Sequence, residues 1–393
     1  MGILGLHKFL DKNTKAGITD LACYKLKDKV IAVDASIFIY QFASAIKSSV
    51  DDLKTSDGRI TTHIHGILTK ILSMLKKKLK PIFIFDGKAS YLKQNVLDNR
   101  KLVKTTANIE IKQVIKKLKK IQDMLEPIPE TSEAIQEQLE NVKKAKELQE
   151  TLIKLKKRTV LVSFKQMEEC KEIVKLLGIP MIQSLEEADS QCAWLVKNGF
   201  ADYVASEDMD ILTFGANKLI RKLSAKDNVV EYDLKILLKE LDLSQEQFID
   251  LCILLGCDYT PTISKIGPKR AYELIKQYKS IDNILLDKDF RSKYILPENF
   301  NYKEAREYFI NPPINEIKKE ELVWSIPKYN ELKELLKIKY EYSDENIQKL
   351  FGVLQGGYYS VICGAKSKKE YEKDKFTYIK KLKENINFDS DSD

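Results

Sequence analysis

Histidine and cysteine are scarce in this chain of 393 residues, and their scarcity restricts the metals that the protein could bind. The three histidines are too few to build a zinc site, and the six cysteines contain no Cys-x-x-Cys pair. Protein zinc sites depend largely on these two residue types. Any bound metal is therefore expected to have oxygen ligands, which favours Mg²⁺ or Mn²⁺.

Long apolar runs are also missing. No run is long enough to span a bilayer, and the first residues do not show the charged flank and hydrophobic segment of a secretory signal. The cysteines are scattered, mostly within apolar stretches, which predicts buried, reduced thiols in an intracellular protein with no membrane partner. The formal charge of +8 permits a polyanionic partner without establishing one.

Three strand-like segments each end on carboxylates. "KVIAVDAS" ends on Asp34, "PIFIFDG" on Asp86, and "DYVASEDMD" on Asp208 and Asp210. Continuous apolar runs separated by helical patterns are typical of parallel strands buried on both faces. Because ligands of such sheets bind beyond the carboxyl ends of the strands, we expect these carboxylates to meet at one edge. Taken alone, the last segment would be better explained as an exposed turn after a strand.

Two further acidic residues stand at the start of a predicted helix. Residues 168–177 predict one helix ending at Gly178, "GIPMIQ" a strand, and "SLEEADSQCAWLVKNG" a second helix with Ser184 as its N-cap. Ser184 and Glu187 have the spacing of a capping box, so capping alone could account for Glu187. Capping leaves Asp189 unexplained, and both carboxylates would still lie at the same edge of the sheet.

Two charged helical segments follow one another between about residues 101 and 165. "IKQVIKKLKKIQDML" and "NVKKAKELQETLIKLKKR" have helical periodicity, and "EPIPETSE" separates them. The predicted structure is a helical hairpin inserted into the sheet domain. For the Glu-rich part, a solvated helix face is a sufficient explanation of the charge.

Residues 247–278 predict two helices joined by a turn that contains Gly256 and Asp258. Pro268 opens the second helix, and Lys269 and Arg270 follow it. A helix N-terminus with free backbone amides and adjacent basic side chains is a favourable phosphate site. An ordinary connection between two helices would give the same pattern.

The acidic residues together form a candidate metal site. They come from predicted strand ends and turns far apart in the sequence: Asp34, Asp86, Glu187, Asp189, Asp208, Asp210 and Asp258. Such density is unfavourable without cations and suits two divalent ones. Two metals about 3.5 to 4 Å apart can activate a water and stabilise the leaving oxygen of a phosphodiester. The cluster therefore predicts metal-dependent hydrolysis of a nucleic-acid backbone, with basic residues holding the polyanion.

Several motifs in fixed order carry a resemblance to a known family: "MGILGLHKFL", "AVDASIFIYQF", "PIFIFDGKASYLK", "EEADSQCAWL", "ASEDMDILTFG" and "LLGCDYTPTISKIGPKRA". Apart from the middle hairpin and the tail, the chain resembles the flap structure-specific endonucleases of the xeroderma pigmentosum group G nuclease superfamily. The resemblance implies an α/β fold, a mostly parallel twisted sheet flanked by helices as in PIN-like nuclease cores. A helical arch and a helix-two-turn-helix DNA-binding element would be added to it.

The same resemblance implies a division of the chain. The N-terminal nuclease region would cover 1–100, the arch 101–165, and the internal nuclease region 166–285, with the helix-two-turn-helix at 247–278. A C-terminal extension, 286–393, would end in a disordered acidic tail. "LVWSIP", with Trp324, resembles the segment that packs this extension against the core.

Roles for individual residues also follow from the resemblance. The first metal group would be Asp34, Asp86, Glu187 and Asp189, and the second Asp208, Asp210 and Asp258. Catalysis would rest on Asp34, Asp86, Lys93 and Arg100, the last two neutralising the scissile phosphate. Tyr40 would stack on a base, and Gly2 would approach the DNA after loss of Met1. The implied DNA-binding residues are Gly2, Tyr40, Lys47, Lys93, Arg100, Gly256, Asp258, Lys269 and Arg270. A K⁺ ion would bind backbone carbonyls near Thr262, Ile263 and Ile266.

The chain departs from the family pattern in five respects. Asp189 replaces a glutamate, Lys265 replaces a glycine of the turn beside the K⁺ site, and Lys47 replaces an arginine. The arch region is longer than is usual in the family. The C-terminus also lacks a recognisable sliding-clamp peptide, so recruitment by a clamp is not expected.

The leading interpretation is a 5′ flap endonuclease with 5′ to 3′ exonuclease activity, acting by two-metal-ion catalysis in replication, including Okazaki fragment maturation, and in repair. The expected partners are two Mg²⁺ ions, with Mn²⁺ as a substitute, and DNA with 5′ flaps, nicks or gaps. We expect a monomer, in the nucleus if the source is a cellular eukaryote. Alternatives are a sister 5′ exonuclease or junction resolvase, an RNase of a related fold, and a non-catalytic nucleic-acid-binding scaffold. The scaffold is disfavoured because every metal position retains a carboxylate.

Overall fold

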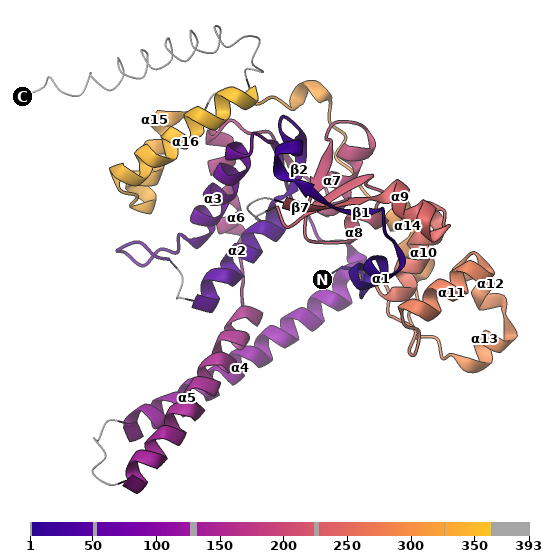
Figure 1. Ribbon diagram of the computed structural model, residues 1–393, viewed down its shortest axis with the longest axis horizontal. Coiled ribbons are helices and arrows are strands. Elements are labelled where there is room, and N and C mark those ends of the chain that lie inside the picture. Colours follow the sequence, from indigo (N-terminus) through magenta and orange to yellow (C-terminus); the bar gives the residue numbers. More distant parts are fainter. Residues whose placement is uncertain (1, 50–52, 126–131, 224–227, 326, 363–393) are drawn as a thin grey trace, which may run out of the picture.

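The computed structural model describes residues 2–49, 53–125, 132–223, 228–325 and 327–362. Within these residues, seven strands form one sheet in the order β1-β7-β6-β5-β2-β3-β4 (Figure 1). The strands are β1 (Ile18–Ala22), β2 (Val30–Asp34), β3 (Lys80–Phe85), β4 (Met181–Gln183), β5 (Tyr203–Ala205), β6 (Lys218–Arg221) and β7 (Asn228–Asp233). Neighbours from β4 to β6 are parallel, whereas β7 pairs antiparallel with β6 and β1. The predicted mostly parallel α/β sheet is confirmed.

The central strands are buried on both faces, as their continuous apolar runs predict. Along β2, Ile31 and Val33 pack into one core and Ala32 into the other, because successive side chains of a strand point to opposite faces. The first core is completed by α2 (Ala35–Ser49), α3 (Thr62–Lys76) and α6 (Phe164–Leu176). The second is completed mainly by α1 (Leu6–Asn13), α7 (Ala188–Lys197), α8 (Asp210–Thr213), α9 (Leu234–Leu241) and α10 (Gln245–Leu255).

A smaller group of helices extends the second core beyond α10. It comprises α11 (Pro268–Tyr278), α12 (Ile281–Leu286), α13 (Lys288–Lys293) and α14 (Tyr302–Ile310). Pro268 is the first residue of α11, as the sequence predicts, because its missing N–H is not needed there. The connection between α10 and α11 therefore has the expected two-helix form.

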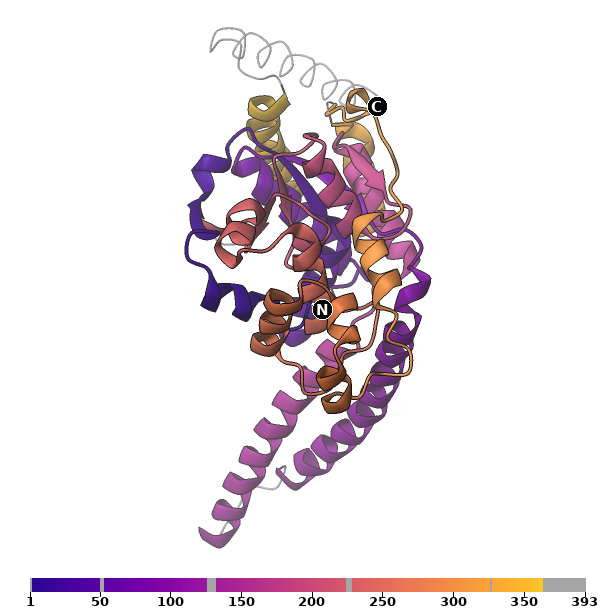
Figure 2. The same cartoon turned by 90° about the vertical axis from the view of Figure 1, so that its right-hand side faces the viewer.

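Helices α4 (Gln94–Leu125) and α5 (Ser132–Arg158) form the predicted hairpin, which extends away from the sheet in both views (Figures 1 and 2). The hairpin has a small core of its own, in which Ala107 and Val114 of α4 lie with Leu155 of α5. Helix α4 begins at Gln94, ahead of the expected boundary near residue 101. Residues 126–131 of the predicted break lie outside the described residues, and the division of the chain into units stays a prediction.

The C-terminal helices return to the first core. Helices α15 (Tyr329–Glu334) and α16 (Asp344–Ile362), with the π-helical turn η4 (Leu335–Lys339) between them, contribute buried residues beside α3 and α6. The indole N–H of Trp324 donates a hydrogen bond of 2.9 Å to the carbonyl of Pro81 in β3, which confirms that this segment packs on the sheet domain. The acidic tail lies outside the described residues.

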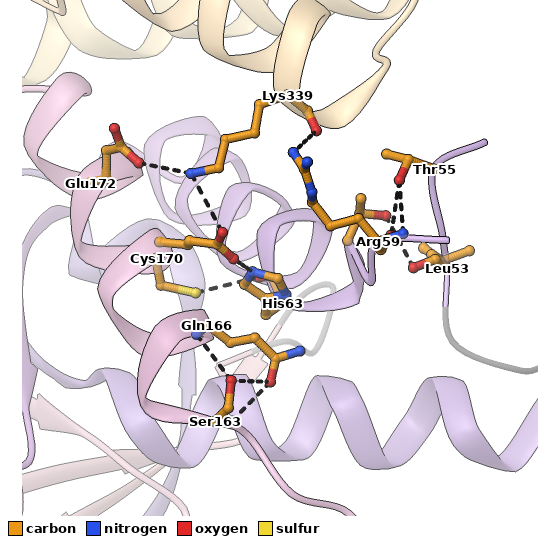
Figure 3. A network of polar contacts seen from close by, with 11 residues as sticks. Leu53, Thr55, Arg59, His63, Ser163, Gln166, Cys170, Glu172 and Lys339 are labelled. Atoms are coloured by element: carbon orange, nitrogen blue, oxygen red, sulfur yellow. Dashed lines mark hydrogen bonds and ion pairs between the residues drawn. The ribbon is translucent and has the colours of Figure 1, made fainter. Parts of the chain in front are cut away.

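A buried polar network joins η4 to two helices of the sheet domain (Figure 3). Glu169 of α6 places one oxygen 2.7 Å from Nε2 of His63 in α3 and the other 3.4 Å from the ammonium of Lys339. Arg59 donates to the carbonyl of Lys339 at 3.0 Å. Burial lowers the pKa of His63, and the hydrogen bond to Glu169 opposes this effect.

The described cysteines are free thiols. Cys23, Cys170, Cys192 and Cys252 are buried and Cys257 is partly buried, whereas Cys363 lies outside the described residues. None of the helices described is both long and apolar enough to cross a bilayer.

Candidate active site

The parallel strands bring the predicted carboxylates to one edge of the sheet. Asp34 is the last residue of β2, Asp86 follows β3, and Asp208 and Asp210 follow β5. Asp34 is 5% exposed and Asp210 is 1% exposed, so two of the four lie within the protein rather than on a solvated turn. The exposed-turn interpretation of the segment around Asp208 is therefore wrong for Asp210.

Glu187 and Asp189 reach the same edge from the start of α7. Glu187 is the N-cap residue of that helix, and its side chain makes no capping hydrogen bond. The prediction that Ser184 caps the helix is wrong, because its hydroxyl donates to the carbonyl of Phe85 at 2.7 Å instead. The amide of Ala188 donates to Oδ1 of Asp86 at 2.9 Å, so Asp86 takes the place of a cap. The carboxylate of Glu187 is thus available to the site.

The N-terminal segment lies directly on the acidic cluster. The amide of Ile3 donates to Oδ1 of Asp210 at 2.8 Å, and the amide of Asp210 donates to Oδ1 of Asp208 at 3.2 Å. Gly2 has φ +79°, and a Cβ atom added there would lie 1.9 Å from Oδ1 of Asp208. Only glycine fits this position, because a side chain would be excluded both by the conformation and by the carboxylate.

Two basic residues neutralise part of the cluster: Lys93, the last residue of the 3-10 turn η2 (Tyr91–Lys93), and Arg100 in the following helix α4. The ammonium of Lys93 lies 2.8 Å from Oε2 of Glu187 and 3.5 Å from Oδ2 of Asp258, and Arg100 donates to the same Asp258 oxygen at 2.7 Å. Lys93 is 15% exposed and Arg100 is 39% exposed. Their separation of seven residues places both on one face of the helical segment. The structure therefore brings Lys93, Arg100 and Asp258 together with the carboxylates of the strands.

Tyr259 completes this arrangement and was not identified from the sequence. Its hydroxyl donates to Oε2 of Glu187 at 2.6 Å, and its ring lies 5.1 Å from the ammonium of Lys93. Its place directly after Asp258 was a possible signal, but a tyrosine beside an apolar helix is more often part of a core.

Burial and mutual repulsion disfavour the charged forms of the carboxylates. The pKa of Asp34 is raised well above its usual value by burial and by Asp86, and the pKa of Asp189 by burial and by Asp34. Burial likewise raises the pKa of Glu187, with Lys93 opposing it. Burial would lower the pKa of Lys93, but Glu187 and Asp258 raise it above its usual value, so this ammonium stays charged.

The donor atoms fit hard divalent cations. Oε1 of Glu187 and Oδ1 of Asp189 are buried and have no hydrogen-bond partner among the described residues. Such unpaired buried oxygens are costly unless a cation or water satisfies them. Among the described residues, no group of three or more acidic, histidine or cysteine side chains is already arranged to hold a metal ion. Glu187 is instead paired with Lys93, and Asp258 with Arg100. Side chains would therefore have to turn towards a bound metal.

The remaining candidate residues lie around this cluster. Tyr40 is partly buried on α2, and burial raises the pKa of its hydroxyl. The side chain of Lys47 lies outside the described part of the structure. Lys269 is exposed in the first turn of α11, and Arg270 lies 3.5 Å from Glu273. The N-cap residue of α11, Gly267, provides no side chain to occupy the free amides of that helix.

The turn between α10 and α11 has two residues in the left-handed region. Gly256 has φ +112°, and a Cβ atom there would lie 2.5 Å from the side chain of Thr262. Lys265 has φ +68°, which explains why a glycine is favoured at this position of the family motif. Of the potassium candidates, Ile263 and Ile266 are buried and the carbonyl of Ile263 accepts from the amide of Ile266 at 3.3 Å.

Comparisons with known proteins identify related sequences and a related fold. Residues 1–107 match the model of the XPG N-terminal domain, and residues 178–258 match that of the XPG I-region. Flap endonuclease 1 of Entamoeba histolytica is 37% identical over 354 residues, 89% of this chain and 86% of the relative. Flap endonuclease 1 of Osmerus mordax is 34% identical over 398 residues, which cover 98% of this chain and 97% of the relative. The catalytic core of Rad2 in complex with DNA superposes with a TM-score of 0.65 at 23% identity, covering 90% of this chain and 100% of the other, which supports the fold.

Proposed function

The chain belongs to the flap endonuclease family of XPG-type nucleases, and we propose that it cleaves DNA where a 5′ single strand leaves a duplex. As a member it is a structure-specific, metal-dependent DNA nuclease. The observation that carries the proposal is the contact of the acidic cluster with Lys93 and Arg100, which lie just before and within the first turns of α4, the first helix of the hairpin.

In this proposal the carboxylates hold two Mg²⁺ ions, for which Mn²⁺ can substitute. The ligands would be Asp34, Asp86, Glu187, Asp189, Asp208, Asp210 and Asp258, whose carboxylate oxygens are the donors that such cations prefer. When bound, the two ions supply activation of the attacking water and neutralise charge on the leaving oxygen. The unpaired oxygens of Glu187 and Asp189 support this assignment.

Lys93 and Arg100 would act on the scissile phosphate. Lys93 neutralises Glu187 and Asp258, and Arg100 neutralises Asp258. A phosphate diester entering the site meets two positive charges on one helix face, which hold it and reduce the repulsion from the cluster. The burial of Lys93 strengthens this interaction because water screens it little.

The surrounding elements would bind the rest of the substrate. The free amides of α11, with Lys269 and Arg270, would hold duplex phosphates, and a K⁺ ion would assist at the adjoining turn. Tyr40 would stack on a base at the junction, and Gly2 brings the backbone close to the DNA. The hairpin of α4 and α5 would enclose the 5′ single strand. We propose that the protein acts as a monomer, inside the cell, in DNA replication and repair.

Single-turnover cleavage of a labelled double-flap DNA in Mg²⁺ tests the proposal. A parallel reaction uses the same DNA with a bulky group bound to its 5′ end beforehand. We expect cleavage next to the junction of the free flap, with a 5′-phosphate on the product, and strong inhibition by the bulky group. Cleavage that is unaffected by the bulky group would indicate a junction or bubble nuclease. The absence of cleavage in both Mg²⁺ and Mn²⁺ would indicate a binding scaffold.

A further inference from the structure

Tyr259 lies behind the acidic cluster in a fully packed environment. Tyr259 is 3% exposed. Its ring centroid lies 4.7 Å from the ring centroid of Tyr308 and 5.0 Å from that of Phe309. These contacts fix the ring without any help from the hydroxyl. The hydroxyl nevertheless donates to Oε2 of Glu187 at 2.6 Å, so it performs a task that packing does not require.

The two oxygens of Glu187 consequently have different surroundings. Oε2 accepts hydrogen bonds from the hydroxyl of Tyr259 and from the ammonium of Lys93, at 2.6 and 2.8 Å. Oε1 is buried and has no hydrogen-bond partner among the described residues. Two donors on one oxygen restrict rotation of the carboxylate and leave the other oxygen as the available ligand.

We propose that Tyr259 is a positioning residue that orients Glu187 so that Oε1 faces the metal. This inference rests on the proposed function, in which Glu187 is a metal ligand. Lys93 supplies the second donor only until it turns to the phosphate of the substrate. The hydroxyl of Tyr259 then becomes the donor that keeps Glu187 in place, because its ring is buried and packed against Tyr308 and Phe309. Groups that orient a metal ligand typically change metal affinity or activity by about 10- to 100-fold when removed.

Tyr308 provides a matched control within the same cluster. Its hydroxyl donates to Oε2 of Glu186 at 2.7 Å, and its ring packs on that of Tyr259. Both Tyr259→Phe and Tyr308→Phe therefore remove one hydroxyl bonded to one glutamate and keep the aromatic packing. Only the first hydroxyl contacts a predicted metal ligand.

The test is a titration of the metal-free, full-length protein with Mn²⁺, in which electron paramagnetic resonance measures the free ion. We expect Tyr259→Phe to weaken Mn²⁺ binding about 10- to 100-fold, and Tyr308→Phe to leave it unchanged. The Mg²⁺ concentration for half-maximal single-turnover cleavage should shift in the same way, while the Kd for flap DNA without divalent metal stays the same. Thermal unfolding of both metal-free variants should remain close to that of wild type.

A second comparison separates orientation of Glu187 from other effects. In a Glu187→Gln background, the further change Tyr259→Phe should alter Mn²⁺ affinity little, because the group that Tyr259 orients is already gone. Equal Mn²⁺ binding by wild type and Tyr259→Phe would overturn the positioning role alone. Equal weakening in Tyr259→Phe and Tyr308→Phe would overturn it too, since packing would then be the cause. A wild-type protein that binds no Mn²⁺ would overturn the metal-dependent function together with this inference.

Discussion

Replacement of Lys93 by methionine removes the cation that lies deepest in the acidic cluster. Its ammonium is 2.8 Å from Glu187 and 3.5 Å from Asp258, and the side chain is 15% exposed. Removing one partner of a buried ion pair costs about 3 to 5 kcal/mol. Because Tyr259 still donates to Glu187 and Arg100 to Asp258, the lower end of this range applies. We therefore expect Lys93→Met to reduce the free energy of unfolding of the metal-free protein by about 3 kcal/mol.

Urea unfolding followed by circular dichroism, at neutral pH in EDTA, measures this loss. The matched control is Lys101→Met, since Lys101 lies 3.2 Å from Asp98 but is 74% exposed, and such surface pairs contribute about 0 to 1 kcal/mol. Saturating Mn²⁺ should reduce the difference between Lys93→Met and wild type. Single-turnover cleavage should fall about 10²- to 10³-fold with little change in DNA affinity. Equal stability of Lys93→Met and Lys101→Met in EDTA would refute the ion-pair reasoning, and an unchanged cleavage rate would remove Lys93 from the catalytic set.

Three other changes have definite expected outcomes. Asp208→Ala should abolish nearly all cleavage, while DNA binding without divalent metal, measured by gel shift, should be retained. An equal loss of DNA binding would show that Asp208 has a structural role. Lys265→Gly should raise the free energy of unfolding in urea by about 1 kcal/mol, because relief of the left-handed strain exceeds the added chain entropy, and a decrease would contradict this. Because burial lowers the pKa of His63, the unfolded state binds more protons, so stability falls as pH drops below about 6.5. His63→Gln should flatten this fall when urea unfolding is measured over a series of pH values, and a slope equal to that of wild type would refute the assignment.

The parts of the fold that depend on local pattern could be predicted. Strand β2, which ends at Asp34, and strand β3, which ends just before Asp86, are short, continuous apolar runs, and burial on both faces requires that composition. The hairpin helices and the start of α11 at Pro268 also follow local rules. Strands β1, β6 and β7 were not predicted. Their pairing joins Ile18 to Tyr232, and no local pattern specifies a contact over such a separation.

In the candidate site, too, contacts between side chains that are distant in the sequence could not be predicted from local pattern. Its carboxylates could be collected from the sequence because strand ends of a parallel sheet share one edge. Ser184 was misassigned as a cap, since the competing acceptor, the carbonyl of Phe85, belongs to a distant strand. Tyr259 was missed because its role depends on the oxygen of Glu187 that it reaches across the fold. Spacing thus identifies which residues gather, but not which oxygen each of them engages.

Helix α4 connects the chemistry of the site to the hairpin in a way that no motif records. It is continuous from Gln94 to Leu125, so Arg100 and the hairpin core around Ala107 belong to one helix. A helix rises 1.5 Å per residue, which places that core about 10 Å from Arg100 along the same axis. Arg100 must therefore move whenever this part of α4 tilts, and its distance of 2.7 Å to Asp258 must change with it. In the proposed function, in which the hairpin encloses the 5′ single strand, a tilt of α4 would therefore also change the contact between Arg100 and Asp258.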